Sequence, residues 1–151
     1  MTNPGFCGII YTEREGNTMT TITLAILDRQ YKNNGQEAER IFRYTMTGEI
    51  TKADNLAHNL GTDCLHYQVK SARATVCRGR DLATYLAEDK ATEFAYVLAD
   101  FSKAVIMNKE EYIEFVNLFG TVTRESAKNG GYEKIRLGHE TEKMREWLAR
   151  A

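Results

Sequence analysis

The chain has 151 residues, of which 42% are hydrophobic and 27% are charged, a balance typical of one globular domain with its own core. The formal net charge is −1, so a globally basic surface is excluded and any nucleic-acid interface must be a local patch. The sequence has no apolar run long enough to predict a membrane partner, and no secretory signal at its start. Cys7, Cys64 and Cys77 lack C-x-x-C spacing, which favours reduced thiols in a cytoplasmic protein over a disulfide framework or zinc site.

Residues 1–18 differ from the rest of the chain, with a short apolar run at 5–11 followed by polar residues. Met19 offers a second start, so we expect an N-terminal extension at 1–18 and a single domain at 19–151. Residues 20–27 mix β-branched and aliphatic side chains, which predicts an ordered segment and leaves strand and helix both open.

A helix is predicted at 36–47, after a turn rich in Asn and Gly. Asn34 is expected to cap it, with Glu37 as the reciprocal partner, and Gly48 is expected to end it. One face of this helix carries the residues spaced for a core: Ala38, Ile41, Phe42 and Thr45.

A strand with chemically suggestive residues is predicted next, because apolar and polar side chains alternate from Leu65 to Lys70. Gln68 and Lys70 therefore share a face, and Asp63 stands at the strand entry. A carboxylate and an amide oxygen suit a hard cation such as Mg²⁺, which polarises a phosphoryl oxygen and activates water. A neighbouring lysine can stabilise charge on a phosphate or assist the attacking water.

This segment resembles the core of the PD-(D/E)xK nuclease superfamily, in the variant where Gln replaces the second acid, over about residues 35–100. The resemblance implies an α/β fold with a mixed central sheet flanked by helices, a restriction-endonuclease-like core. It also implies Mg²⁺-dependent cleavage of DNA. Asp63 would be the principal metal ligand, and Gln68 and the Val69 carbonyl would supply further oxygens. Lys70 would stabilise charge or activate water.

Two further acids enter through the same resemblance. Members of the family often place a Glu on the first helix, pointing at the metal, which implies Glu39 as an auxiliary acid. Asp54 lies at a more usual spacing than Asp63 and competes with it for the role of first acid. The alternative interpretation is that the strand is amphipathic with a solvated polar face, and that Glu39 is a solvated carboxylate on the flank of its helix.

Basic residues follow the lysine closely, in a run that we expect to continue or pair with the same strand. A hydroxyl and guanidinium groups beside a phosphate site suit backbone contacts, although a polar strand end would look the same. The candidates for nucleic-acid binding are Ser71, Arg73, Arg78 and Arg80.

The second half of the chain predicts alternating helices and strands: a helix at 81–90, strands at 93–99 and 104–107, a helix after Asn108 and a last helix at 141–150. Asn108 and Glu111 have the spacing of a capping box, and Gly120 is expected to end that helix. Asn129, Gly130 and Gly131 predict a turn.

The basic residues of the tail permit two interpretations. They could line a groove for a nucleic-acid backbone, or they could form a plain solvated surface, because Glu125 and Glu133 are interleaved with them. These residues are Arg124, Lys128, Lys134 and Arg136.

The sequence thus leads to one principal prediction, Mg²⁺-dependent hydrolysis of DNA by Asp63, Gln68, Lys70 and Glu39. The alternative is a non-catalytic module of the same fold that binds nucleic acid or a protein partner. An accessory protein of a phage or mobile element, such as an inhibitor of a host defence, would be of this second kind.

Overall fold

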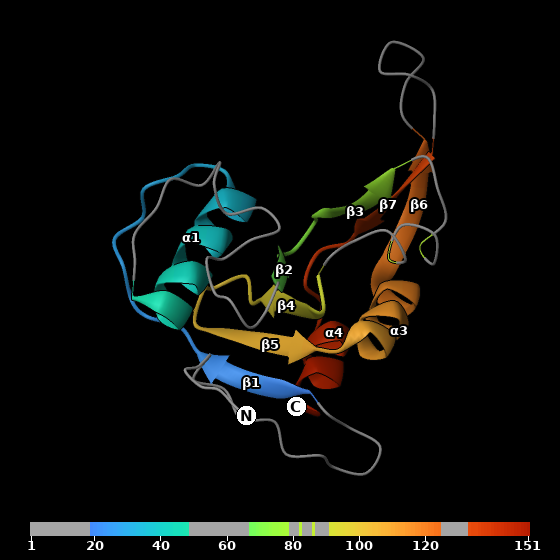
Figure 1. Ribbon diagram of the computed structural model, residues 1–151. Helices are drawn as coiled ribbons and strands as arrows, with labels where there is room; N and C mark the ends of the chain where they lie inside the picture. The colour runs from blue at the N-terminus through green and yellow to red at the C-terminus, as the bar shows by residue number, and fades with distance from the viewer. Residues whose placement is uncertain (1–18, 49–66, 79–81, 83–85, 87–90, 125–132) are drawn as a thin grey trace.

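The computed structural model describes residues 19–48, 67–78, 91–124 and 133–151, together with Leu82 and Leu86. Within them the strands form two sheets (Figure 1). The first sheet has the spatial order β1 (Thr20–Thr23), β5 (Lys103–Met107), β4 (Glu93–Val97), β2 (Tyr67–Lys70). The second has the order β3 (Thr75–Arg78), β7 (Glu133–Leu137), β6 (Gly120–Arg124). The helices are α1 (Asn34–Thr47), α3 (Lys109–Phe119) and α4 (Glu142–Leu148).

The predicted mixed α/β architecture is present in the first sheet. β2 runs parallel to β4, whereas β5 runs antiparallel to both of its neighbours. Side chains alternate across the sheet, so Ala95 and Val97 pack with α1 while Phe94 and Tyr96 pack with α3 and α4. The sheet is therefore a middle layer, with α1 on one face and α3 and α4 on the other (Figure 1).

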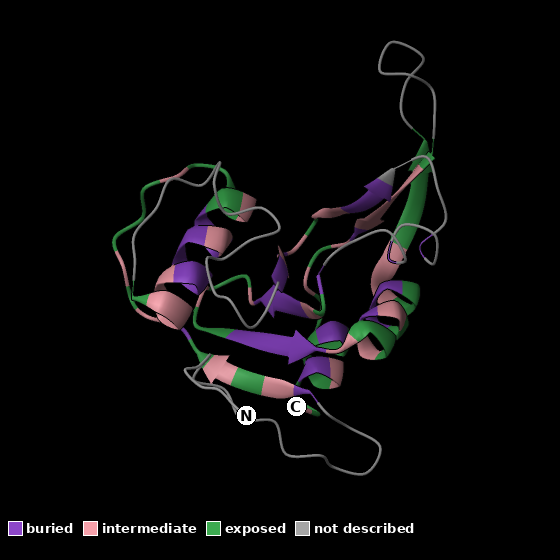
Figure 2. Ribbon diagram, in the orientation of Figure 1, coloured by how far each residue is buried: buried purple, intermediate pink, exposed green. Residues whose placement is uncertain are grey.

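Aromatic side chains fill both faces of this sheet. Figure 2 shows β4 and β5 buried over nearly their whole length. Phe94 stacks on Tyr112 of α3 with ring centroids 4.4 Å apart, and on the other face Phe42 meets Tyr67 edge-on at 5.1 Å. Burying a side chain of this size stabilises the fold by roughly 1.5–3 kcal/mol, so these contacts fix where α1 and α3 lie.

Helix α1 begins one residue earlier than the predicted cap requires. Asn33 is the N-cap and its side chain accepts a hydrogen bond from the Gln36 amide at 3.0 Å, so the prediction of Asn34 was wrong by one position. Glu37 does not close a capping box. It is buried, forms a 2.9 Å ion pair with Arg40, and accepts hydrogen bonds from two backbone amides of the preceding segment. This pairing fastens the segment after β1 to the helix.

The two strands predicted at 93–99 and 104–107 are confirmed as β4 and β5, which pair as a hairpin, and so is the capped helix after them. Asn108 accepts from the Glu111 amide, and Glu111 accepts from the Asn108 amide, both at 2.8 Å. Gly120 ends α3 as predicted, but in an extended conformation with φ −90°. A Cβ atom there would lie 2.7 Å from the Val116 carbonyl oxygen, so glycine is needed for close approach rather than for left-handed backbone.

The run after Lys70 does not continue or pair with β2, which corrects the expectation from the sequence. Instead the Ala74 amide donates to the Ser71 carbonyl at 3.2 Å, and Arg73 takes a left-handed φ of 67°. This turn ends β2, and the chain enters the second sheet as β3, paired with β7. The sequence did not predict this second sheet or its β6–β7 hairpin.

Other predictions have mixed outcomes. The strand option holds for Thr20–Thr23, Gly48 ends α1 with φ 75°, and α4 packs Met144 and Leu148 into the core. Leu82 and Leu86 are helical and buried, and Cys77 is buried. In the part of the chain that the structure describes, no helix is long and apolar enough to cross a bilayer. Some predictions fall on residues outside those that the structure describes, namely 1–18, Cys64, Lys128, Asn129, Gly130 and Gly131.

Candidate functional site

Strand β2 places two of the predicted site residues on one face, as its alternation required. The parallel register sets Gln68 beside Phe94 and Lys70 beside Tyr96, on the face that packs against α3. Gln68 is buried, with 5% of its surface exposed, and Lys70 is half-buried. The amide is thus buried and the ammonium group half-buried, rather than on an open surface.

Lys70 has a defined hydrogen bond. Its Nζ atom donates to the backbone carbonyl of Thr75, the first residue of β3, at 2.9 Å. The side chain therefore spans the turn that joins the two sheets. This bond fixes the position of the ammonium group at the junction of β2 and β3.

Glu39 lies on α1, and the structure brings it near this lysine. Burial raises the pKa of the Glu39 carboxyl group to about 7, and the positive charge of Lys70 opposes that rise. Because the two groups interact, a helix residue and a strand residue that are far apart in the sequence share one electrostatic environment. A carboxyl group that titrates near neutrality is suited to proton transfer and is typical of functional sites.

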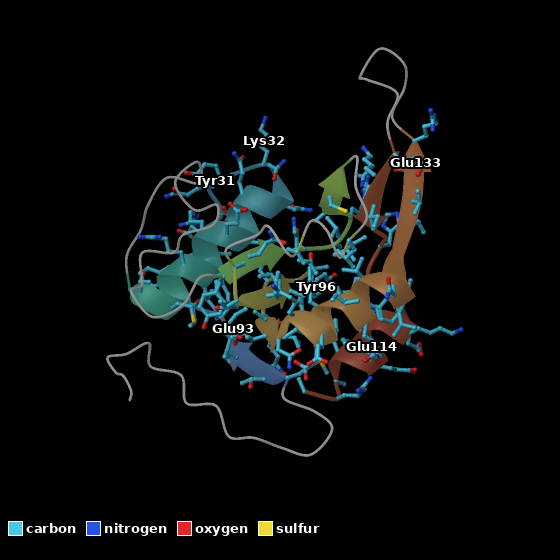
Figure 3. The ribbon with its side chains drawn as sticks, turned by 45° about the vertical axis from the view of Figure 1, so that its right-hand side comes forward. Tyr31, Lys32, Glu93, Tyr96, Glu114 and Glu133 are labelled. Carbon is cyan, nitrogen blue, oxygen red and sulfur yellow. The ribbon has the colours of Figure 1, made fainter. Side chains whose placement is uncertain are left out.

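Tyr96 is the residue of β4 that pairs with Lys70, and its hydroxyl group binds a residue of another segment. Its hydroxyl donates to Glu140 Oε1 at 2.9 Å, and the same oxygen accepts from the Ala99 amide at 2.9 Å. Burial, followed by the Glu140 charge, raises the pKa of Tyr96 far above its usual value, so the phenol stays protonated. Figure 3 shows Tyr96 in the middle of the molecule, where this hydrogen bond ties β4 to the segment before α4.

The metal-ligand set is described in part. Val69 packs its side chain against the core on the α1 side, so its backbone carbonyl is the group it could offer a cation. Asp63 and its competitor Asp54 lie outside the described residues. Among the side chains that the structure does describe, no group of three or more His, Cys, Asp or Glu is placed to hold a metal ion.

The predicted nucleic-acid contacts separate into different environments. Ser71 is 5% exposed and lies beneath the turn, whereas Arg73 is exposed at its tip. The Arg73 amide donates to the Gly138 carbonyl at 3.0 Å, and its carbonyl accepts from Arg136 Nε at 2.7 Å. Arg78 pairs through its backbone with β7, and Arg80 lies outside the described residues.

Arg136 is one of the basic tail residues that the sequence offered for a nucleic-acid groove, but its position beside this turn was not predicted. It lies on β7, where Lys134, Ile135, Arg136 and Leu137 alternate basic with apolar side chains. That alternation was the available signal for a strand with one basic face. The interleaved acids of the tail obscured it, although an acid and a base that are neighbours on a strand lie on opposite faces.

Compared with protein-family models, with curated proteins and with solved structures, the chain gives no match. The resemblance to PD-(D/E)xK nucleases therefore depends on the residues around β2 and on the order of the surrounding elements.

Proposed function

We propose that the protein is a Mg²⁺-dependent nuclease that hydrolyses phosphodiester bonds in DNA, at a site around Lys70 at the end of β2. The observation that carries this proposal is the charge interaction of Glu39 with Lys70, together with the burial that raises the pKa of the Glu39 carboxyl group to about 7. A carboxyl group that can gain or lose a proton near neutral pH, beside an ammonium group, suits the activation of water next to a phosphate.

The oxygen atoms that the described residues offer are of the kind that binds Mg²⁺. The Gln68 amide oxygen, the Val69 carbonyl and the Glu39 carboxylate are all oxygen ligands, which Mg²⁺ prefers, and Asp63 would be the principal one. A bound Mg²⁺ would polarise a phosphoryl oxygen and lower the pKa of a bound water. In this proposal Lys70 stabilises negative charge on the phosphate, and Glu39 accepts or orients the proton of the water.

The connection from β2 to β4 also supports the proposal. The two strands are parallel, and the residues between them include Leu82 and Leu86, which are helical and buried. The chain between them also forms β3 of the second sheet, and the connection as a whole joins two parallel strands, as a crossover does. With α1 before it, this connection follows the element order that the nuclease resemblance implies.

A second candidate is a non-catalytic module of the same fold that binds nucleic acid or a protein partner. The observation that favours it is the engagement of the Lys70 ammonium group with the Thr75 carbonyl, together with the burial of Gln68. In this alternative both side chains stabilise the junction of the two sheets, and DNA or a partner binds without being cleaved.

Nicking of supercoiled plasmid separates the two candidates. The wild type is expected to nick with Mg²⁺ and to stop when EDTA is added, and Asp63→Asn and Glu39→Gln are expected to be at least about 10- to 100-fold slower. Glu110→Gln is the matched control, because Glu110 is an exposed carboxylate on α3. A pure wild-type preparation that binds plasmid but never nicks it would favour the non-catalytic module.

A further inference from the structure

The second sheet has one face that is composed of hydroxyl and basic side chains. Directly paired residues of neighbouring strands project from the same face. Arg136 pairs with Thr75 of β3 on one side and Thr121 of β6 on the other, and Lys134 pairs with Thr123. These five residues, with Arg73 at the adjoining turn, are named here the hydroxyl–basic face. Among its described members there is no acidic side chain.

The opposite face of the same sheet has a different composition. Ile135 and Leu137 pack against the core there, with Val122 farther out. Glu133 also projects from that side, since it alternates with Lys134 along β7, and its carboxylate lies 4.0 Å from the Arg124 guanidinium. Figure 3 shows Glu133 at the outer end of the hairpin. Glu133 therefore lies on the opposite face of β7 from Lys134 and Arg136.

The hydroxyl–basic face is accessible along β6. Thr121 and Thr123 are exposed, and Figure 2 shows most of β6 in the colour of exposed residues. Lys134 and Arg136 are half-buried, which leaves part of each cationic side chain in solvent. A ligand could thus reach hydroxyl groups and cations on the same surface.

Arg73 and Arg136 are held together at one end of this face. Arg136 Nε donates to the Arg73 carbonyl at 2.7 Å, which fixes the side chain while its terminal nitrogens keep the fork geometry that matches two phosphate oxygens. The Arg73 side chain is exposed. Its backbone has a φ of 67°, a left-handed conformation that favours glycine. A basic residue kept at a position better suited to glycine points to a function for its side chain.

We propose that the hydroxyl–basic face binds the phosphate backbone of duplex DNA. Arginine, lysine and threonine side chains are common donors to phosphate oxygens, and a face whose described members include no acid attracts a polyanion even though the whole chain has a net charge of −1. This inference rests on the proposed function in taking DNA as the ligand, but it does not depend on cleavage.

The test is fluorescence anisotropy of a labelled DNA duplex in EDTA, so that binding is measured without hydrolysis. Lys134→Glu and Arg136→Glu are each expected to weaken binding about tenfold or more, and to reduce the slope of log K against log salt by about 1. Arg124→Glu is the matched control, with the same change of charge in the same hairpin on the opposite face, and is expected to stay within about twofold of the wild type. Arg136→Lys should retain more binding than Arg136→Glu because it keeps the charge.

Thermal unfolding of each variant separates loss of fold from loss of contact. The inference is overturned if the wild type does not bind DNA, if Arg124→Glu weakens binding as much as Lys134→Glu, or if polyglutamate competes as well as DNA. Absence of nicking with selective loss of binding in the face variants would reject the nuclease and leave this inference standing. Nicking by the wild type, with equal DNA binding by the face variants and Arg124→Glu, would support the nuclease and reject this inference.

Discussion

The two sheets place their polar side chains in different environments. The first sheet is covered on both faces, and near β2 the Glu39 carboxyl group is desolvated and interacts with the charge of Lys70. Among the described residues the second sheet packs one face against the core, and its charged side chains are exposed or half-buried. Proton transfer by a group with a shifted pKa requires the buried environment of the first sheet, whereas recognition of a polyanion requires the more exposed charges of the second.

The difference in burial should appear most strongly as a difference in stability. Phe94→Ala in the first sheet removes a fully buried ring stacked on Tyr112, and should lower the free energy of unfolding by about 3–5 kcal/mol. Val122→Ala in the second sheet removes methyl groups from a side chain that is 63% exposed, and should change it by less than about 0.5 kcal/mol. Urea denaturation checks both, and similar losses would contradict the contrast between the sheets.

A pH titration of stability probes the desolvated carboxyl group. The folded-state pKa of Glu39, about 7, lies above the ordinary value of 4.5, so the folded state holds a proton that the unfolded chain releases. This contribution to stability is complete below pH 4.5 and is lost as the pH rises through 7. Because the group is half-buried and screened, we expect a loss of about 1–2 kcal/mol between pH 5 and 8.

Glu39→Gln isolates that contribution, because glutamine does not titrate. The variant should match the wild type near pH 5 and become the more stable of the two near pH 8, as measured by thermal unfolding at each pH. If the two proteins keep a constant difference in stability over this range, Glu39 does not have the raised pKa that its burial implies.

The smallest effect concerns the turn at the edge of the second sheet. Arg73→Gly relieves a left-handed conformation and should raise the free energy of unfolding by up to about 1 kcal/mol, while DNA binding weakens. Arg73→Ala loses the same cation but keeps the disfavoured φ, so it should weaken binding without the gain in stability. Equal stability of the two variants would show that the backbone there is not strained.

Local signals in the sequence were enough for most of the first sheet. The alternation through Gln68 and Lys70, the capping box at Asn108 and the glycines at 48 and 120 each act within a few residues, and each has the predicted effect. The placement of Glu39 near Lys70 followed from a resemblance and not from spacing. Its raised pKa could not be predicted, because burial depends on contacts between distant segments.

The second sheet was missed for a physical reason. Its strands come from residues 75–78, 120–124 and 133–137, and the turn at Arg73 that separates β3 from β2 uses a residue that seldom adopts left-handed backbone. Without that turn, the run after Lys70 reads as a continuous strand. The sorting of Lys134 and Arg136 away from Glu133 follows from alternation along β7, so it could have been read from the sequence once a strand was assigned to 133–137.

The most direct test of the central claim compares two lysines with the same kind of bond. Lys70 Nζ donates to the Thr75 carbonyl at 2.9 Å, and Lys109 Nζ donates to the Leu86 carbonyl at 3.1 Å, so replacing either lysine with methionine removes one ammonium–carbonyl hydrogen bond. We expect Lys70→Met to slow Mg²⁺-dependent plasmid nicking by about 100-fold or more while Lys109→Met nicks like the wild type. Equal nicking rates for the two variants, at equal folded fractions, would contradict a catalytic role for the site around Lys70.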